Sequence, residues 1–333
     1  MRAAVVGSPG EDVEITERER PDPGPGEVRL DVAACGVCGG DMAVLGGGEG
    51  VDYPRVPGHE IAGRIDAVGP AVSEWSVGDR VAVGWHGGHC FSCSQCAHGN
   101  FTTCADKRVT GISRDGGLAE YATVRQEAMT GVPDGVDLAH AGPLVCAGLT
   151  AYNVLRNSET RPGDVVAVQG VGGVGHMGIQ FADAMGYETV ALSRGPEKRE
   201  PAFDLGADRF VDTTETDPAE ALGGFGGADA ILATAPSAQA MEQVIDGLAP
   251  EGELLLIGAP QEPLELQVGP LLDNRWSVKG WSAGHPGDAR DTLKLTAERD
   301  IEPWIETYSL GETETAVRRL LEGEARFRTV LEP

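Results

Sequence analysis

The stretch VVAVQGVGGVGHMGIQ, residues 165–180, decides how the second half of the chain folds. The β-branched run 165–169 predicts a buried strand, and the apolar spacing that follows predicts a helix. Between them stand three glycines in G-x-G-x-x-G order, a turn that lets the backbone approach a dinucleotide pyrophosphate at a helix N-terminus. We therefore expect a nucleotide-binding βα turn formed by Gly170, Gly172, Gly173, Val174 and Gly175.

The segments on either side of this turn differ in the spacing of their apolar residues. Downstream, the strand-like runs 188–193, 208–212, 229–234 and 252–258 alternate with helix-spaced segments. This alternation predicts βα units in a doubly wound parallel sheet, and hence an α/β fold class. Upstream of about residue 145, short apolar runs broken by Gly and Pro predict a β-rich region with many turns.

The strand predicted at 188–193 ends in Ser193, and Arg194 follows it. A site for NAD usually has Asp or Glu here, which holds the ribose 2′-hydroxyl, whereas an arginine attracts a 2′-phosphate. The sequence therefore favours NADP over NAD, with Lys198 in the same segment. The alternative is that Arg194 is an exposed side chain without a role.

The composition excludes several classes of partner. The chain has 333 residues and a formal net charge of −26, which should repel nucleic acid and anionic lipid. Only Lys107, Lys198, Lys279 and Lys294 are lysines, a scarcity that indicates adaptation to concentrated salt. A merely acidic cytosolic protein from a GC-rich genome is the alternative. No signal peptide or membrane span is expected, which favours a cytoplasmic location.

Four cysteines cluster in HCFSCSQCAHGNFTTC, residues 89–104. Disulfides are improbable in a reducing cytosol, and an iron–sulfur cluster of the bacterial ferredoxin type would end in Cys-Pro. Four thiolates in one short loop can close a tetrahedron around Zn²⁺ and leave no open position. We therefore predict a structural zinc held by Cys90, Cys93, Cys96 and Cys104.

The other three cysteines are scattered. Cys38 lies in a Gly-rich turn before Asp41, His59 lies beside Glu60, and Cys146 precedes the βα region. Two thiolates and one imidazole suit a catalytic zinc whose fourth position stays open for a substrate oxygen. Cys35 is interpreted as a small buried hydrophobe.

Together these motifs resemble the zinc-containing medium-chain alcohol dehydrogenases, nearest the bacterial and cinnamyl-type branch. The resemblance rests on CGVCGGD, GHE, the four-cysteine loop, CAGLT, GVGGVG and FRTVLEP, and covers essentially the whole chain. It implies a GroES-like catalytic domain over 1–147, a Rossmann domain over 148–277, and a segment over 278–333 that returns to the catalytic domain. It also implies a homodimer or homotetramer.

The resemblance assigns roles residue by residue. Cys38, His59 and Cys146 match the catalytic zinc ligands, Glu60 a carboxylate that can approach the metal, and Asp41 the acid that orients the histidine. The expected cofactor contacts outside the glycine turn are Thr150 near the nicotinamide, Ile257 and Trp281 flanking its ring, and Arg328 on the pyrophosphate. Trp85 and His86 are expected to line the substrate pocket.

The implied activity is hydride transfer between NADP(H) and a small-molecule alcohol or aldehyde, with two zinc ions per chain. The departures are Gly39, Gly40 and Ala43, because the family usually has a hydroxyl at position 40 and often a histidine at 43 for proton relay. We expect water to fill that space, or a substrate or ribose hydroxyl to carry the proton. The alternatives are reduction of another activated carbonyl or alkene, and a nucleotide-binding protein with little turnover.

Overall fold

The computed structural model describes residues 1–333 and divides into two compact units. Unit 1 comprises Met1–Leu149 and Ala283–Pro333, and unit 2 comprises Thr150–Ser282. The sequence places the second boundary after residue 277, whereas unit 2 continues to Ser282. The difference arises because β15 (Ser277–Gly280) pairs with β14 (Leu248–Leu256) and so completes the sheet of unit 2.

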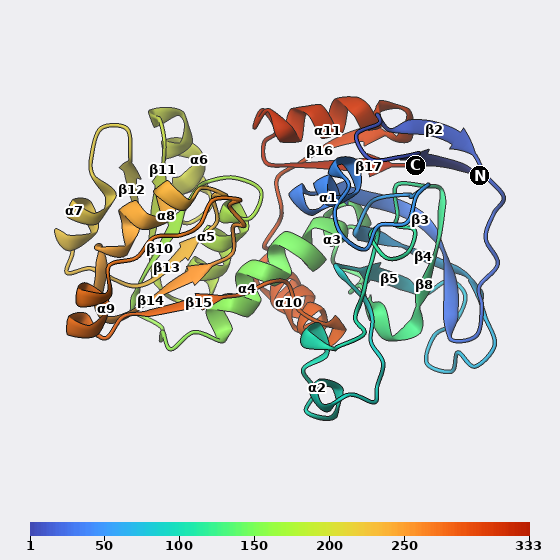
Figure 1. Ribbon diagram of the computed structural model, residues 1–333, viewed down its shortest axis with the longest axis horizontal. Coiled ribbons are helices and arrows are strands. Elements are labelled where there is room, and N and C mark those ends of the chain that lie inside the picture. Colours follow the sequence, from blue (N-terminus) through green and yellow to red (C-terminus); the bar gives the residue numbers. More distant parts are fainter. The chain divides into compact units, whose positions relative to one another are not determined.

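Unit 2 is a six-stranded sheet with helices packed on its strands (Figure 1). The strand order is β12-β11-β10-β13-β14-β15, and every neighbouring pair is parallel. The interior strands are almost wholly buried, as parallel strands covered by helices must be. The remaining strands are β10 (Val165–Gln169), β11 (Glu188–Ser193), β12 (Arg209–Asp212) and β13 (Ala228–Ala233), and the helices are α5 (Gly175–Ala184), α6 (Arg199–Asp204), α7 (Pro218–Gly223), α8 (Ala238–Ile245) and α9 (Val268–Asn274).

Unit 1 is built on a seven-stranded sheet in the order β16-β17-β3-β4-β5-β9, with β8 also paired to β3. The C-terminal strand β17 (Arg328–Glu332) lies antiparallel to β3 (Glu27–Val37), so the end of the chain returns to the first unit. The other strands of unit 1 are β1 (Arg2–Val5), β2 (Glu14–Glu17), β4 (Glu60–Val68), β5 (Arg80–Val83), β6 (His86–Gly88), β7 (Arg108–Val109), β8 (Tyr121–Arg125), β9 (Met129–Gly131) and β16 (Ile305–Ser309). This β-rich unit and the doubly wound unit 2 confirm the predicted fold class.

The helices of unit 1 are few, and two of them matter for the site. They are α1 (Met42–Gly46), α2 (Ser94–Ala97), α3 (Leu138–Pro143), α10 (Pro286–Arg299) and α11 (Thr313–Leu321). Helix α2 belongs to the four-cysteine lobe, which extends from the body of unit 1 (Figure 1). Helix α3 packs on β3 and β4.

Helix α3 continues through a π-helical turn, Leu144–Gly148, into α4 (Leu149–Arg156). The whole stretch Leu138–Arg156 is long and apolar enough to cross a membrane by length and composition, but 78% of it is buried inside the protein. It is therefore typical of a core helix. The cap of α3 is Asp137, whose side chain accepts a 2.7 Å hydrogen bond from the Ala139 amide.

Candidate metal centres and cofactor-binding loop

The pairing of β3 with β4 brings the first two predicted ligands together. The strands are antiparallel, and Gly36 near the end of β3 pairs with Glu60 at the start of β4. Cys38 follows β3 and His59 precedes β4, so both lie at the same edge of the sheet. Gly36 is required here, because a Cβ at that position would lie 2.0 Å from Oε2 of Glu60.

Cys146 reaches the same place from the π-helical turn. Its Sγ lies 3.8 Å from Sγ of Cys38 and 3.4 Å from Nε2 of His59. A π turn inserts one extra residue into a helix and is frequent at functional sites. Three residues far apart in sequence therefore present two sulfurs and one ring nitrogen to one point.

These atoms fit a zinc ion. Ligand atoms of Cys38, His59, Glu60 and Cys146 all lie within 4.8 Å of one another. A tetrahedral zinc with Zn–S bonds of about 2.3 Å has ligand–ligand edges of about 3.8 Å, which the sulfur–sulfur distance matches. Glu60 is fully buried, and its Oε2 has no hydrogen-bond partner. A buried carboxylate oxygen left over beside two thiols and an imidazole is the chemistry of a metal site.

Asp41 holds His59 in one orientation. Its Oδ1 accepts hydrogen bonds from Nδ1 of His59 at 2.8 Å and from the Gly58 amide at 3.1 Å, and its Oδ2 accepts from the Cys38 amide at 2.9 Å. The bond at Nδ1 leaves Nε2 of His59 facing the two sulfurs as a metal ligand. Burial alone would lower the pKa of the imidazole, but the charges of Asp41 and Cys38 raise it well above its usual value.

Arg328 lies beside the same centre, on β17. Its Nη2 donates to Glu60 and, at 3.2 Å, to the Val37 carbonyl, and the side chain is 3% exposed. The guanidinium therefore offsets the charge of Glu60. The family resemblance implies that Arg328 contacts the cofactor pyrophosphate, and this contact with the pyrophosphate stays a prediction. Burial raises the pKa of Glu60 to about 7, with Arg328 opposing the shift. The local sequence offers no signal of this pair, which joins residues 268 positions apart.

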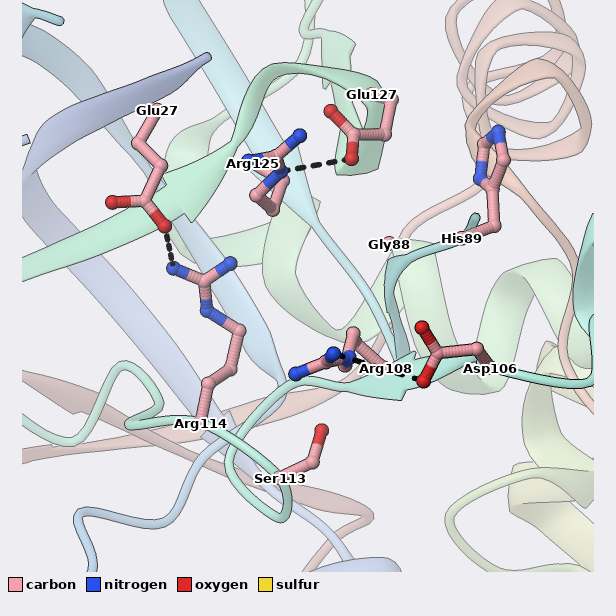
Figure 2. A pocket seen from close by; sticks show the side chains of 9 residues that line it. All are labelled: Glu27, Gly88, His89, Asp106, Arg108, Ser113, Arg114, Arg125 and Glu127. Atoms are coloured by element: carbon pink, nitrogen blue, oxygen red, sulfur yellow. Dashed lines mark hydrogen bonds and ion pairs between the residues drawn. The ribbon is translucent and has the colours of Figure 1, made fainter. Parts of the chain in front are cut away.

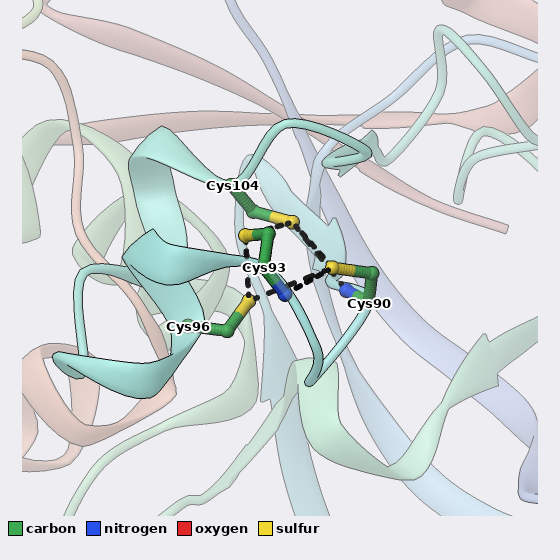
Figure 3. A group of neighbouring side chains, drawn as sticks. All are labelled: Cys90, Cys93, Cys96 and Cys104. Atoms are coloured by element: carbon green, nitrogen blue, oxygen red, sulfur yellow. Dashed lines mark hydrogen bonds between the residues drawn. The ribbon is translucent and has the colours of Figure 1, made fainter.

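The four-cysteine loop forms a second, closed centre (Figure 3). Four sulfur–sulfur distances are 3.5 Å (Cys90–Cys104), 3.6 Å (Cys93–Cys96), 3.8 Å (Cys93–Cys104) and 3.9 Å (Cys90–Cys96). They again match the edges of about 3.8 Å of a tetrahedral zinc–thiolate site. All seven cysteines are free thiols, so no disulfide competes for these sulfurs. Cys35 is fully buried in the core of unit 1, which confirms its interpretation as a small hydrophobe.

Trp85 borders the space that Gly40 leaves. A Cβ at Gly40 would lie 2.7 Å from Cζ3 of Trp85 and 3.0 Å from Cε1 of His59. The indole packs edge-on against the His59 ring, with centroids 4.8 Å apart. The Trp85 ring therefore borders this space, and the expectation that water or a substrate or ribose hydroxyl carries the proton stays a prediction. Ala43 packs in the same small apolar cluster as Trp85.

His86, the second predicted pocket residue, is buried in β6. Its Nε2 shares a 2.9 Å hydrogen bond with Nδ1 of His89. Burial, assisted by the neighbouring His89, lowers the pKa of His86 to about 4, so the ring is neutral at physiological pH. Its role in a substrate pocket stays a prediction.

The glycine turn joins β10 to α5 as the sequence predicts. Gly170 has φ of +97°, and a Cβ at Gly175 would lie 1.7 Å from the Gly170 carbonyl oxygen, so both positions demand glycine. A Cβ at Gly172 would meet nothing within 4 Å, which leaves its backbone open to a ligand. The turn fits a pyrophosphate held at the N-terminus of a ten-residue helix. Gly173 and Val174 are half-buried in the same turn.

Arg194 is exposed just after β11 and makes no ion pair. Asp212, at the end of β12, accepts three hydrogen bonds at Oδ1, from the Gly195 and Thr214 amides at 2.9 Å and from the Thr214 hydroxyl at 2.7 Å. Ser193 and Lys198 are half-buried on either side.

The remaining predicted cofactor contacts lie in unit 2. Ile257 follows β14 and Trp281 follows β15, and the Trp281 amide donates to the Leu256 carbonyl at 3.0 Å, so both lie at the carboxyl edge of the sheet. Parallel sheets bind ligands at that edge. Thr150 is buried in the first turn of α4.

Comparison with known families gives two matches. Residues 24–134 match the alcohol dehydrogenase GroES-like domain, and residues 173–298 match the zinc-binding dehydrogenase family. The chain is 43% identical over 309 residues to the alcohol dehydrogenase notN of Aspergillus sp. strain MF297-2, covering 93% of this chain and 91% of that one. It is 35% identical over 310 residues to the aldehyde reductase AdhA of Synechocystis sp., covering 92% and 91%.

Solved structures agree with these matches over almost the whole chain. A cinnamyl alcohol dehydrogenase from Sorghum bicolor superposes with a TM-score of 0.90 at 28% identity, covering 99% of this chain and 97% of that one. CAD from Helicobacter pylori, complexed with NADP(H), superposes with a TM-score of 0.88 at 26% identity, with the same coverage.

Proposed function

Because the chain belongs to the zinc-dependent medium-chain alcohol dehydrogenases, we propose that it interconverts small alcohols and aldehydes with NADP(H), favouring aldehyde reduction. The observation that carries the proposal is the convergence of Cys38, His59 and Cys146 on one point, with Glu60 beside them. Three protein ligands in this arrangement leave a fourth position for a substrate oxygen, whereas the four-cysteine centre has none.

The residues of the proposed catalytic site have separate roles. When bound, zinc supplies a Lewis acid that polarises the substrate oxygen, and the nicotinamide supplies or accepts the hydride. Cys38, Cys146 and Nε2 of His59 would hold the metal, and Asp41 would keep the histidine in the required tautomer. Trp85 packs edge-on against one side of the His59 ring.

The proton route follows from the same packing. Gly40 supplies no hydroxyl, and the Trp85 ring borders the space that a side chain would occupy there. We therefore infer that a hydroxyl on the substrate or on the cofactor ribose, or water beside the ring, carries the proton. This route favours hydroxylated substrates over simple apolar alcohols.

Changing Gly40 to serine should lower turnover, although it restores the hydroxyl that the family usually has. The new Cβ would press on Trp85 and His59, and overpacking of this kind costs about 1–3 kcal/mol. Steady-state kinetics with a primary alcohol, together with zinc content, measures the effect. The double variant Gly40→Ser/Trp85→Ala is the matched control and should recover part of the loss. Faster turnover in the single variant would show that the indole yields readily and that the relay is the deficit.

We infer the preference for NADP from the exposed Arg194 guanidinium, which makes no ion pair, and from Ser193 and Arg194 standing where an NAD site usually has an acid. Changing Arg194 to Asp should reverse the preference toward NAD. The variant removes a charge-assisted contact to the 2′-phosphate and adds a repelling carboxylate, so NADP affinity should fall by about ten- to a hundredfold. Fluorescence titration with NADPH and NADH measures both constants. A parent that already binds NADH more tightly than NADPH would contradict the assignment.

We further propose a homodimer or homotetramer, with the edge strand β15 facing a second copy. β15 pairs on one side only, and Val268, Leu272 and Val278 nearby are exposed. Unpaired strand edges and exposed apolar groups favour association. Light scattering coupled to size exclusion tests this, and a monomer at micromolar concentration would contradict it.

We also propose a cytoplasmic enzyme of the cinnamyl-type branch, adapted to concentrated salt. The seven free thiols suit a reducing compartment, and the charge of −26 is tolerable where salt screens it.

The proposed activity is tested by absorbance at 340 nm. Alcohols and aldehydes, including hydroxylated ones, are assayed with NADPH and NADH at low and at molar KCl. We expect the fastest reaction with an aldehyde and NADPH in high salt. Tight NADPH binding without turnover of any substrate would favour a nucleotide-binding protein with little turnover. Turnover of activated alkenes alone would favour the alternative activity, reduction of an activated alkene.

A further inference from the structure

A cavity of about 400 Å³ in unit 1 is lined by none of the proposed metal ligands, although it borders the ends of the four-cysteine loop (Figure 2). It is bordered by the start of β3, the end of β8, the turn after β6 and the start of β7. Six charged side chains line it: Glu27, Asp106, Arg108, Arg114, Arg125 and Glu127. This volume falls within the range of small-molecule sites.

The three arginines keep unused hydrogen-bond donors. The hydrogen bonds of the Arg114 side chain come from Nη2, which donates to Oε1 of Glu27 at 2.9 Å and to the Thr123 carbonyl at 3.0 Å. Figure 2 shows its other terminal nitrogen directed away from Glu27, into the space that Arg108 and Arg125 also border. Arg114 is 18% exposed, so this donor is held in place.

The other two guanidinium groups also keep hydrogen-bond donors without a partner. Arg125 donates through Nε to Glu127 at 2.9 Å and through Nη1 to the Pro25 carbonyl at 3.3 Å, which leaves Nη2. Arg108 makes no hydrogen bond and only an ion pair of 3.6 Å with Asp106. Each acid therefore neutralises one arginine and leaves the remaining edges of the guanidinium group without a partner.

Gly88 borders the cavity with a φ of +139°, a conformation that favours glycine. The three acids balance the three arginines, so this lining is close to neutral in a chain with a net charge of −26, and an anion meets less repulsion here than on the average surface of the chain.

We propose that this cavity binds a phosphate group, either free or on a small organic ester. Guanidinium groups bind phosphate oxygens through pairs of parallel donors, and three such groups border one space here. The volume exceeds that of inorganic phosphate and leaves room for an organic portion. Because His89 and Asp106 lie next to Cys90 and Cys104, the bound ligand would contact both ends of the four-cysteine loop.

Calorimetric titration of the zinc-loaded protein with inorganic phosphate and with glycerol 3-phosphate, in a low-chloride buffer, tests the proposal. We expect millimolar or tighter binding to the parent. Arg108→Gln should weaken it about tenfold through loss of one charged contact. Arg108 is 57% exposed, so this variant should fold like the parent. Tighter binding of the ester would identify an organic phosphate as the ligand, and equal binding would identify phosphate itself; either result supports the site.

Two matched variants control for binding elsewhere. Arg318→Gln removes an arginine of similar exposure, paired with Glu322 on α11, and should leave phosphate affinity unchanged. Arg194→Gln removes the arginine proposed to hold the cofactor phosphate, and should also leave the signal in place. Absence of binding to the parent, equal weakening by Arg108→Gln and Arg318→Gln, or loss of the signal with Arg194→Gln instead would each overturn the proposal. None of these outcomes depends on NADPH turnover.

Discussion

Replacing Cys146 with alanine should nearly abolish turnover while the protein stays folded. The variant removes one of three ligands from a centre where the Cys146 sulfur lies 3.8 Å from that of Cys38 and 3.4 Å from Nε2 of His59. Loss of Lewis-acid assistance removes several kcal/mol of transition-state stabilisation, so kcat should fall by about three orders of magnitude. Steady-state assay with metal analysis by mass spectrometry measures both effects, and about one zinc per chain should be lost.

Cys35→Ala is the matched control for this experiment. Cys35 is also a fully buried thiol of unit 1, but it packs in the apolar core and is not among the clustered ligand atoms. This variant should keep its zinc and most of its turnover. If Cys146→Ala retained both the metal and the rate, the catalytic role of the Cys38–His59–Cys146 centre would have to be abandoned.

Replacing Cys93 with serine should destabilise the protein without touching the chemistry directly. The lobe has little apolar core of its own, because α2 has only four residues and Phe91 is 62% exposed. Zinc bound by such a loop contributes to folding free energy. We expect a Tm lower by about 10 °C, at about 2–4 °C per kcal/mol for a unit of this size. Differential scanning calorimetry and zinc content measure the effect.

Ser94→Ala, one residue further along the same loop, separates loss of a ligand from general disturbance of the loop. It should leave the zinc content at the parent value and Tm within about 1 °C, as surface substitutions usually do. A parent with no more than one zinc per chain after gentle purification in salt would count against two metal centres. So would a Cys93→Ser variant as stable as the parent.

The sequence predicts well those parts of the site whose residues lie close together along the chain. The four cysteines between Cys90 and Cys104 and the glycines from Gly170 to Gly175 carry their geometry within one loop each. The cysteine side chains, and likewise the glycine backbones, lie close together because only a few residues separate them in the chain. The alternation of strands and helices after residue 163 is equally local, and unit 2 has the parallel sheet that it predicts.

The parts that it predicts poorly depend on packing between distant residues. No spacing rule indicates that Trp85 lies beside Gly40. The contact depends on how Trp85, the residue before β6, packs against the turn after β3. Arg328 similarly reaches Glu60 only because β17 pairs with β3. The boundary at Ser282 depends on whether β15 joins a sheet, which its exposed and polar sequence does not reveal.

The pairing of β17 with β3 sets an order of events during synthesis. Proteins emerge from the ribosome N-terminus first, and domains generally fold as units when complete. The four-cysteine centre can close once Cys104 has emerged, because its ligands are neighbours. The buried Glu60, however, meets its counter-charge only when Arg328, 268 positions later, has been made. The nascent polypeptide can therefore close its four-cysteine loop long before the centre around Glu60 is electrostatically complete.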